Sequence, residues 1–337
     1  MNDGILVLGI ETSCDETAAA VTVDGRTALS NVIASQIDVH KVFGGVVPEI
    51  ASRHHLEAVC GIVEAALEDA GVRRDELDAI AVTKGPGLVG AVLIGLATAK
   101  AMAFALGKPL VGVHHIRGHI FAAFLENPKL EPPFLALVAS GGHTSLIDVR
   151  GYDELAVLGG TRDDAAGEAF DKVARVLGLG YPGGPMIDLA AGEGDPDAAR
   201  FKRTMLEPGS LDFSFSGIKT GVLNHVNTQR QAGGPVDTAD IAASFQQAVV
   251  DVLVEKTRLA LEQTGRSALV LCGGVAANTA LRERMEGACA QAGVRLFMPS
   301  PVYCTDNAAM IACAGYYDFK AGRRDGYDLD AYAELDL

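Results

Sequence analysis

The chain has 337 residues, of which 49% are hydrophobic and 21% charged, a composition that predicts a packed globular protein and excludes a disordered one. This length exceeds what one hydrophobic core usually supports, so two domains are expected. The formal net charge is 28 minus 43, or −15, which argues against a broad nonspecific nucleic-acid surface but not against a local basic patch.

The cysteines and the first residues bear on the cellular compartment. None of the six cysteines forms a Cys-x-x-Cys pair, so a zinc ribbon and a thioredoxin-like motif are both excluded. Acidic residues with no basic stretch open the chain, so no signal peptide is expected. The longest uncharged apolar run, 85–99, is too short to span a bilayer. We therefore expect a cytoplasmic protein with no membrane segment.

The first predicted elements are two strands within residues 4–23 that flank a small polar turn. This turn holds acids and hydroxyls, among them Glu11, Thr12 and Ser13, which could lie near a phosphate and its metal. An ordinary acidic hairpin tip is the alternative interpretation.

A helix is predicted over 53–70, with Ser52 as its N-cap and a basic, solvated first turn. A strand at 78–83 leads into an apolar helix over 88–106 that must be buried, and a strand at 109–113 follows.

Two histidines after this strand, His115 and His119, are spaced four apart and would share one face of a helix. Imidazoles in that arrangement can bind one metal ion, although a chance pairing is the alternative. His114 points elsewhere, and Gly118 weakens the helix by ~1 kcal/mol relative to Ala. Asp306, which precedes the last predicted helix, could supply the third ligand or merely cap that helix.

The second half repeats the layout of the first. Prolines within 127–133 indicate a linker, and 134–149 again predicts a strand, a small polar turn and a strand. The repetition predicts duplicated halves that each contribute a phosphate-binding hairpin to one cleft. Further on, helices are expected at 238–264 and 308–320. A strand ending at Gly273-Gly274, followed by a helix, is an arrangement that can hold a nucleotide.

Seven motifs resemble those of one family and appear in its order. They are Gly-Ile-Glu-Thr-Ser-Cys-Asp-Glu-Thr, His-His-Ile-x-Gly-His, Ser-Gly-Gly-His-Thr, Ala-Gly-Glu-Ala-Phe-Asp-Lys, Tyr-Pro-Gly-Gly-Pro, Phe-Ser-Phe-Ser-Gly-Ile-Lys-Thr and Gly-Gly-Val-Ala-Ala-Asn. The chain resembles the TsaD family, the transferases of tRNA threonylcarbamoyladenosine synthesis, formerly described as glycoprotein endopeptidases. The resemblance implies an α/β fold, with two ribonuclease-H-like domains of the actin-like ATPase (ASKHA) superfamily around a nucleotide cleft. One domain would span 1–130 plus 305–337, and the other 131–304.

The resemblance also implies roles for particular residues. His115, His119 and Asp306 would bind one divalent metal, iron(II) foremost, with zinc(II) as the alternative. Threonylcarbamoyl-AMP or ATP would occupy the cleft. The residues implied to bind this substrate are Ala139, Ser140, Gly141, Gly142, His143, Asp171, Gly184, Asp188 and Asn278. Glu11, Thr12 and Ser13 would lie near the phosphate, and no general base is assigned.

The activity implied is transfer of threonylcarbamoyl from its adenylate to the exocyclic amine of adenosine 37, in tRNAs that read ANN codons. The implied partners are tRNA, a catalytically inactive (TsaB-like) paralogue and a small (TsaE-like) ATPase. Because the chain is acidic, we expect basic residues to gather on one rim near the metal. The candidates are Arg53, Arg117, Lys202, Arg203 and Lys219.

Four other classes of protein share some of these features. A carbamoyltransferase acting on a small molecule would share the adenylate chemistry, whereas sugar and acetate kinases of the superfamily lack the histidine pair. A zinc protease needs His-Glu-x-x-His, and here Ile116, Arg117 and Gly118 separate the two histidines, so the general base is missing. A non-catalytic ATP-binding scaffold would not need three metal ligands.

Overall fold

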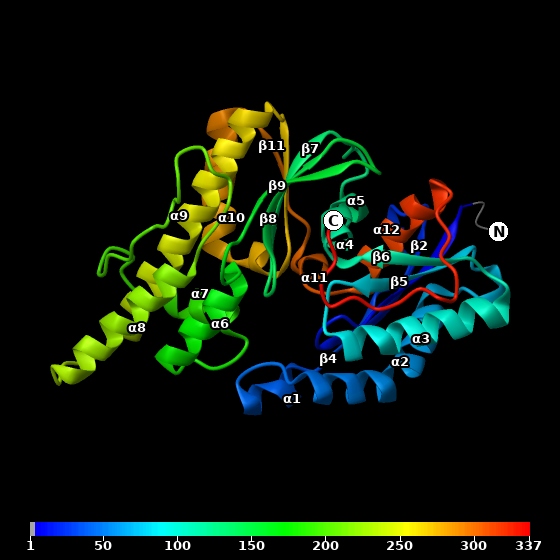
Figure 1. Ribbon diagram of the computed structural model, residues 1–337, viewed down its shortest axis with the longest axis horizontal. Helices are drawn as coiled ribbons and strands as arrows, with labels where there is room; N and C mark the ends of the chain where they lie inside the picture. Colours follow the sequence, from blue (N-terminus) through cyan, green and yellow to red (C-terminus); the bar gives the residue numbers. More distant parts are fainter. Residues whose placement is uncertain (1–3) are drawn as a thin grey trace. The chain divides into compact units, whose positions relative to one another are not determined.

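The computed structural model describes residues 4–337, and the chain divides into two compact units (Figure 1). Unit 1 comprises Met1–Glu131, Gly151–Glu154 and Pro299–Leu337, and unit 2 comprises Pro132–Arg150 and Leu155–Met298.

Unit 1 is built on a mixed sheet. Its strands are β1 (Leu6–Glu11), β2 (Glu16–Val23), β3 (Thr27–Ala28), β4 (Val32–Ser35), β5 (Ala79–Gly85) and β6 (Leu110–His114). Its helices are α1 (Ile37–His40), η1 (Lys41–Phe43), α2 (Pro48–Ala70), η2 (Arg74–Glu76), α3 (Val89–Leu106), α4 (His115–Phe121), α5 (Ala123–Glu126), α11 (Pro301–Cys304) and α12 (Ala308–Lys320). The strand order is β3-β2-β1-β5-β6, and β4 also pairs with β2.

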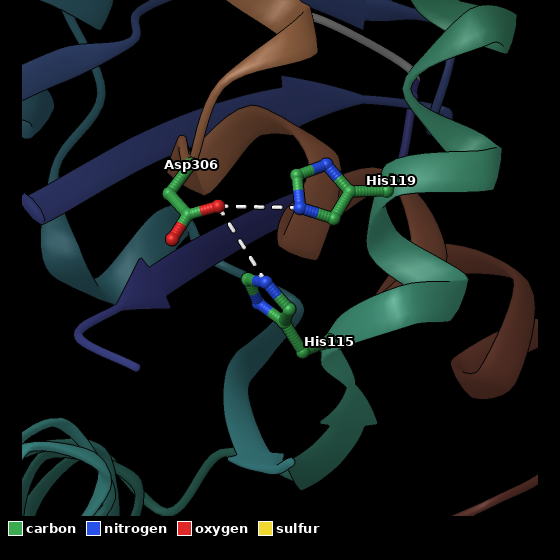
Figure 2. Close-up of side chains that lie close together, drawn as sticks. All are labelled: His115, His119 and Asp306. Carbon is green, nitrogen blue, oxygen red and sulfur yellow. Dashed lines mark ion pairs between the residues drawn. The ribbon is translucent and has the colours of Figure 1, made fainter. Parts of the chain in front are cut away.

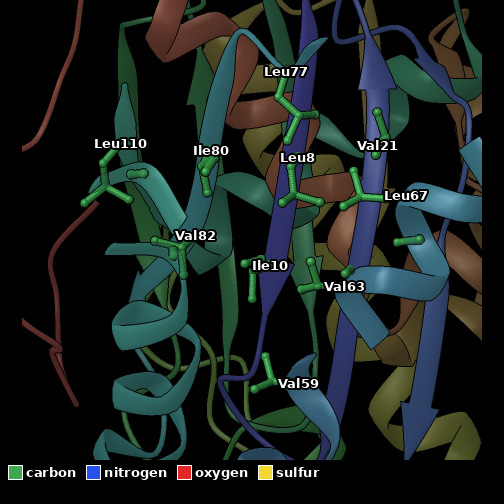
Figure 3. Close-up of a cluster of buried hydrophobic side chains, with 14 of the residues drawn as sticks. Leu8, Ile10, Val21, Val59, Val63, Leu67, Leu77, Ile80, Val82 and Leu110 are labelled. Carbon is green, nitrogen blue, oxygen red and sulfur yellow. The ribbon is translucent and has the colours of Figure 1, made fainter. Parts of the chain in front are cut away.

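Helices α2 and α3 cover one face of this sheet. Figure 3 shows the apolar cluster between them, with Leu8 and Ile10 of β1 facing Val59 and Val63 of α2. Helix α12 packs on β1, β2, β5 and β6. A Cβ on Gly9 of β1 would overlap the backbone of α12, so glycine is required where this helix crosses the sheet. The predicted metal ligands come from two segments next to this sheet: His115 and His119 follow β6, and Asp306 precedes α12.

Among the described residues, α3 is the one helix long and apolar enough to cross a membrane by length and composition, and one third (33%) of it is buried. Its buried residues, such as Leu96 and Ala99, belong to the apolar cluster of unit 1. This face of α3 packs against the sheet, but side chains such as Leu93 and Phe104 are exposed, so the prediction that the helix is buried is correct for one face and wrong for the rest.

Unit 2 repeats the plan with its own sheet. Its strands are β7 (Phe134–Ala139), β8 (Thr144–Val149), β9 (Leu155–Gly160), β10 (Ala268–Cys272) and β11 (Arg295–Phe297), in the order β11-β10-β7-β8-β9. Its helices are α6 (Ala166–Leu177), α7 (Gly183–Ala191), α8 (Ser216–Gln231), α9 (Thr238–Thr264), η3 (Gly274–Ala277) and α10 (Thr279–Ala292).

The two sheets share one topology. In each sheet the first strand pairs antiparallel with the second and, on its other side, parallel with a later strand, and one more parallel strand follows. The order is β2-β1-β5-β6 in unit 1 and β8-β7-β10-β11 in unit 2. This correspondence confirms the duplicated hairpins predicted from residues 4–23 and 134–149.

The start of α2 differs from the prediction. The helix begins at Pro48 with Val47 as its N-cap, so the expected N-cap, Ser52, lies inside it and donates to the carbonyl of Pro48. Proline suits a first helical position because it has no N–H to leave unsatisfied. His55, expected on a solvated helix end, is wholly buried, and its ring nitrogens contact Thr17 Oγ1 at 2.8 Å and the Cys14 carbonyl at 2.9 Å.

Asp148 of β8 gives unit 2 a dependence on acidic pH. Its carboxylate accepts hydrogen bonds from both Arg266 (2.6 and 2.9 Å) and Arg150 (2.9 Å). The bonds from Arg266 lower the pKa of Asp148 below 3.8 although the side chain is buried. A carboxylate with a depressed folded-state pKa stabilises the fold above its unfolded pKa, and this contribution is lost as pH falls through the folded pKa.

We therefore expect Asp148→Asn to lower the free energy of unfolding at pH 7 by about 1.5–3 kcal/mol, the range for hydrogen bonds to charged groups. Below about pH 4 the difference from the wild-type protein should shrink. Urea unfolding of both proteins at pH 7 and pH 3 measures it. A difference that stays constant over this range would show that the Asp148 charge does not carry the effect.

Candidate active site

His115 and His119 lie on α4, and the sequence explains why that short helix forms where it does. His114 ends β6 and caps α4, because its Nδ1 accepts a hydrogen bond from the Ile116 amide. Every residue of α4 is buried. A Cβ on Gly118 would lie 2.8 Å from Ile311 Cδ1 of α12, so the glycine that weakens the isolated helix permits its close packing on α12.

Asp306 reaches the histidines from the turn before α12. The cap of α12 is its neighbour Asn307, whose side chain accepts from the Met310 amide, so Asp306 is not the helix cap. Asp306 Oδ1 lies 3.2 Å from His119 Nε2 and 3.5 Å from His115 Nε2. Figure 2 shows both rings of α4 turned toward this carboxylate oxygen. The three residues singled out by the sequence thus lie together, with one ligand atom each within 4.8 Å of one another.

The chemistry of this cluster fits a metal ion. His119 is wholly buried. Its Nε2 contacts the Asp306 carboxylate, but within residues 4–337 neither ring nitrogen has an assigned hydrogen bond. An unsatisfied buried polar atom costs about 1–3 kcal/mol, and a cation on Nε2 would remove that cost. Two imidazoles and one carboxylate form a donor set suited to iron(II) and zinc(II).

Negative charge concentrates around the cluster. Burial lowers the pKa of His115, but the charges of Asp306 and Glu11 outweigh it and raise the pKa to about 9. Burial, together with the neighbouring Asp306 and Asp15, raises the pKa of Glu16 to about 9. These shifts indicate a site that attracts a cation.

The tip of the first hairpin lies directly against this cluster. Glu11, Thr12 and Ser13 are all buried, and Ser13 Oγ lies 3.1 Å from His115 Nδ1. Thr12 Oγ1 donates to the Ala91 carbonyl of α3. The three residues therefore lie beside the metal cluster, while their nearness to a phosphate stays a prediction.

In unit 2 the residues predicted to bind the adenylate gather in two groups. The first is the turn from Ser140 to His143, closed by a hydrogen bond from the Ser140 amide to the His143 carbonyl (2.8 Å). The Gly167 amide of α6 donates to the Ser140 carbonyl, and a Cβ on Gly273 (φ 89°) would overlap the Ala139 backbone. Gly141 and Gly142 are exposed, with open space beside them.

The second group surrounds Asp188. Its Oδ1 accepts from Asn278 Nδ2 (3.1 Å) and its Oδ2 from Thr279 Oγ1 (2.9 Å). Asn278 Nδ2 also donates to Gln246 Oε1 (2.7 Å), so both hydrogens of its amide are used within the protein. Nearby in the chain, Asp171 Oδ1 accepts from the Gly183 amide (2.6 Å), next to Gly184.

Sequence reasoning missed Thr83 and Gln246. Thr83 donates to Glu11 at 2.6 Å, and the signal was the parallel pairing of β1 with β5, which brings the ends of both strands to one edge. Gln246 lies within the long helix α9 and showed no signal beyond that of a core position.

Three of the five predicted rim cations form ion pairs within the chain. Arg117 is buried and forms an ion pair with Asp318, so its predicted place on an exposed basic rim is wrong. Arg203 pairs with Asp251. Lys219 pairs with Asp164. Lys202, in an irregular segment, and Arg53, on α2, are exposed. The basic residues are thus spread over both units, and most serve structural ion pairs.

Solved structures of other proteins share the fold of this chain. The HypF protein of T. kodakarensis has a TM-score of 0.65 at 16% identity, with 94% of this chain and 48% of that chain covered. Component A of (R)-2-hydroxyglutaryl-CoA dehydratase from Acidaminococcus fermentans has a TM-score of 0.57 at 17% identity, with 95% and 100% covered. At these identities the likeness shows the fold alone. The fold is that of the actin-like ATPases, here with a His-His-Asp cluster in one of its two units.

The family model for "TsaD: tRNA N6-adenosine threonylcarbamoyltransferase" matches residues 27–313. A protein of that name from Desulfitobacterium hafniense is 57% identical over 336 residues, covering 100% of this chain and 98% of the relative. Another, from Clostridium botulinum, is 53% identical over 337 residues, covering 100% and 99%. The chain therefore belongs to the TsaD family, which confirms the resemblance found in its motifs. It is an acyltransferase that modifies tRNA.

Proposed function

We propose that the protein transfers the threonylcarbamoyl group from threonylcarbamoyl-AMP to the exocyclic amine of adenosine 37, in tRNAs that read ANN codons. The family supplies the transfer to a tRNA adenosine. The observation that carries the finer proposal is the presence of a polar cluster on each of the two duplicated sheets. One is the His115, His119 and Asp306 cluster, and the other gathers around Asp188.

The reaction forms a C–N bond between the amine and the carbamoyl carbon, breaks the C–O bond to the phosphate of AMP, and removes one amine proton. A divalent ion held by His115, His119 and Asp306 would supply Lewis-acid neutralisation of charge on the acyl phosphate. Iron(II) is the proposed ion, and zinc(II) the alternative. The Gly141 and Gly142 amides, in open space, would donate to developing negative charge.

The adenylate would be held by unit 2. Asp188 is held in place by Asn278 and Thr279, so its carboxylate is preorganised to accept hydrogen bonds from ribose hydroxyls. Asp171 and Gly184 would complete the nucleoside site, and Ala139 through His143 would face the acyl phosphate. The proposed nucleotide-binding domain is 131–304, and the proposed metal-binding domain is 1–130 plus 305–337.

The net charge of −15 supports a tRNA-binding surface that partner proteins share, because phosphate binding needs positive charge. In this chain Arg117, Arg203 and Lys219 form ion pairs with its own carboxylates. We propose that a TsaB-like paralogue and a TsaE-like ATPase complete that surface in the cytoplasm.

Replacing Asp188 tests the nucleotide site. We expect Asp188→Ala to weaken ATP binding by 10-fold or more, about 1.4 kcal/mol, because the ribose loses its acceptor. Zinc binding should not change, since its ligands lie in the other unit. Calorimetric titration with ATP and with zinc measures both. The matched control is Asp251→Ala, an acid of the same unit that pairs with Arg203 and Arg284. Equal ATP affinity in the Asp188 variant and the wild-type protein would rule the site out.

A further inference from the structure

Glu11, at the end of β1, is a carboxylate buried behind the metal cluster. It is 0% exposed, and both oxygens have partners. Oε1 accepts a hydrogen bond from the Ser13 amide, and Oε2 accepts one from Thr83 Oγ1 (2.6 Å). The hydrogen bonds from Thr83 of β5 and from Ser13 fix the position of the carboxylate.

Glu11 Oε2 also lies 3.1 Å from Nδ1 of His115, the ring nitrogen opposite the one that faces Asp306. A neutral imidazole donates from one nitrogen and accepts on the other. Because an ionised carboxylate only accepts, Nδ1 carries the proton toward Glu11, and the lone pair of Nε2 then points toward Asp306. The Nδ1 atom of His119 has no such partner among residues 4–337, so of the two histidines only His115 has a carboxylate beside its Nδ1.

We propose that Glu11 is a positioning residue of the metal centre: it holds His115 in the Nδ1–H tautomer, turns Nε2 toward the ion and increases the basicity of that nitrogen. Thr83 in turn positions Glu11. The inference rests on the proposed metal function of His115, His119 and Asp306. This role differs from a phosphate contact, because it uses the buried carboxylate oxygens that His115, Ser13 and Thr83 contact.

Zinc affinity of the purified full chain tests the proposal. Carboxylates behind metal-bound histidines typically contribute 10–100-fold to metal affinity, so Glu11→Gln should raise the zinc dissociation constant by about that factor in chelator competition. Glutamine keeps the shape but removes the charge. Thr83→Val should act in the same direction by a smaller factor. If the Glu11 variant does not fold, the Thr83 variant still tests the proposal.

The matched control for Thr83→Val is Thr22→Val on β2, the strand that pairs with β1. The Thr22 hydroxyl is buried and has no partner within the described part of the chain. Its removal should leave zinc affinity unchanged. Thermal unfolding of each apoprotein, recorded in parallel, separates a general loss of stability from a specific loss of metal affinity.

A double-mutant cycle identifies the histidine through which Glu11 acts. In a His115→Ala background, Glu11→Gln should cause no further loss of zinc affinity, whereas in a His119→Ala background it should keep its full factor. An unchanged dissociation constant in Glu11→Gln, or equal losses in both backgrounds, would overturn the inference while the metal centre stands. Zinc binding that is indifferent to both histidines would overturn the centre and the inference together.

Discussion

His119→Ala should greatly weaken metal binding and abolish threonylcarbamoyl transfer while leaving the protein folded. Removing the ring breaks the contact of Nε2 with Asp306 but no assigned hydrogen bond within residues 4–337, so the fold should tolerate the change. Its loss leaves one imidazole and one carboxylate, too few protein ligands for a catalytic site. We expect metal affinity to fall by 100-fold or more, about 2.7 kcal/mol.

Equilibrium dialysis followed by metal analysis measures this loss. His114→Gln is the matched control, since this neighbouring ring is turned toward the Leu335 carbonyl (3.0 Å) and not toward Asp306. Glutamine at that position should keep the metal. Full occupancy in the His119 variant would show that the cluster is not the metal site.

Arg117→Met should destabilise unit 1 and leave a buried, poorly compensated carboxylate. The Arg117 guanidinium contacts Asp318 and the Tyr152 carbonyl (2.7 Å), and lies over the Phe121 ring. Burial raises the pKa of Asp318 although Arg117 and Arg323 both oppose the shift, so the pair does not fully offset the desolvation of the carboxylate. Removing one partner of such a pair costs about 3–5 kcal/mol.

The double variant Arg117→Met with Asp318→Leu should recover most of that loss, because apolar replacement of both partners is often nearly neutral. Urea unfolding of the wild-type protein, the single variant and the double variant measures it. A matched single variant on the surface, Arg73→Met, removes an exposed pair with Asp75 and should cost less than about 1 kcal/mol. A stable Arg117 variant with weakened tRNA binding would restore the original expectation of a rim contact.

Much of the fold follows from local pattern. The expected helices at 238–264 and 308–320 match α9 and α12 residue for residue, because glycine or a polar cap marks their ends and apolar periodicity fills them. The hairpins were visible because each places a small polar turn between two apolar runs. The grouping of His115 with His119 follows from helical spacing alone.

What the sequence did not reveal depends on contacts between distant segments. Arg117 and Asp318 are 201 positions apart, and nothing near Arg117 in the chain indicates that it is buried. The same holds for His55, which is buried because β2 and the first loop fold over α2. Gly118 is unfavourable for an isolated helix, and the reason for a small residue there is its contact with Ile311 of α12, which the sequence does not show.

The most direct test of the proposed function is the formation of the modified nucleoside. The purified chain, with its TsaB-like and TsaE-like partners, iron(II), threonylcarbamoyl-AMP and unmodified tRNA, is incubated and the tRNA nucleosides are analysed by mass spectrometry. We predict threonylcarbamoyladenosine at position 37 and release of AMP in equal amount, with no product when His119→Ala replaces the wild-type chain. Undiminished product from the His119 variant, or AMP release with no modified adenosine, would contradict the account.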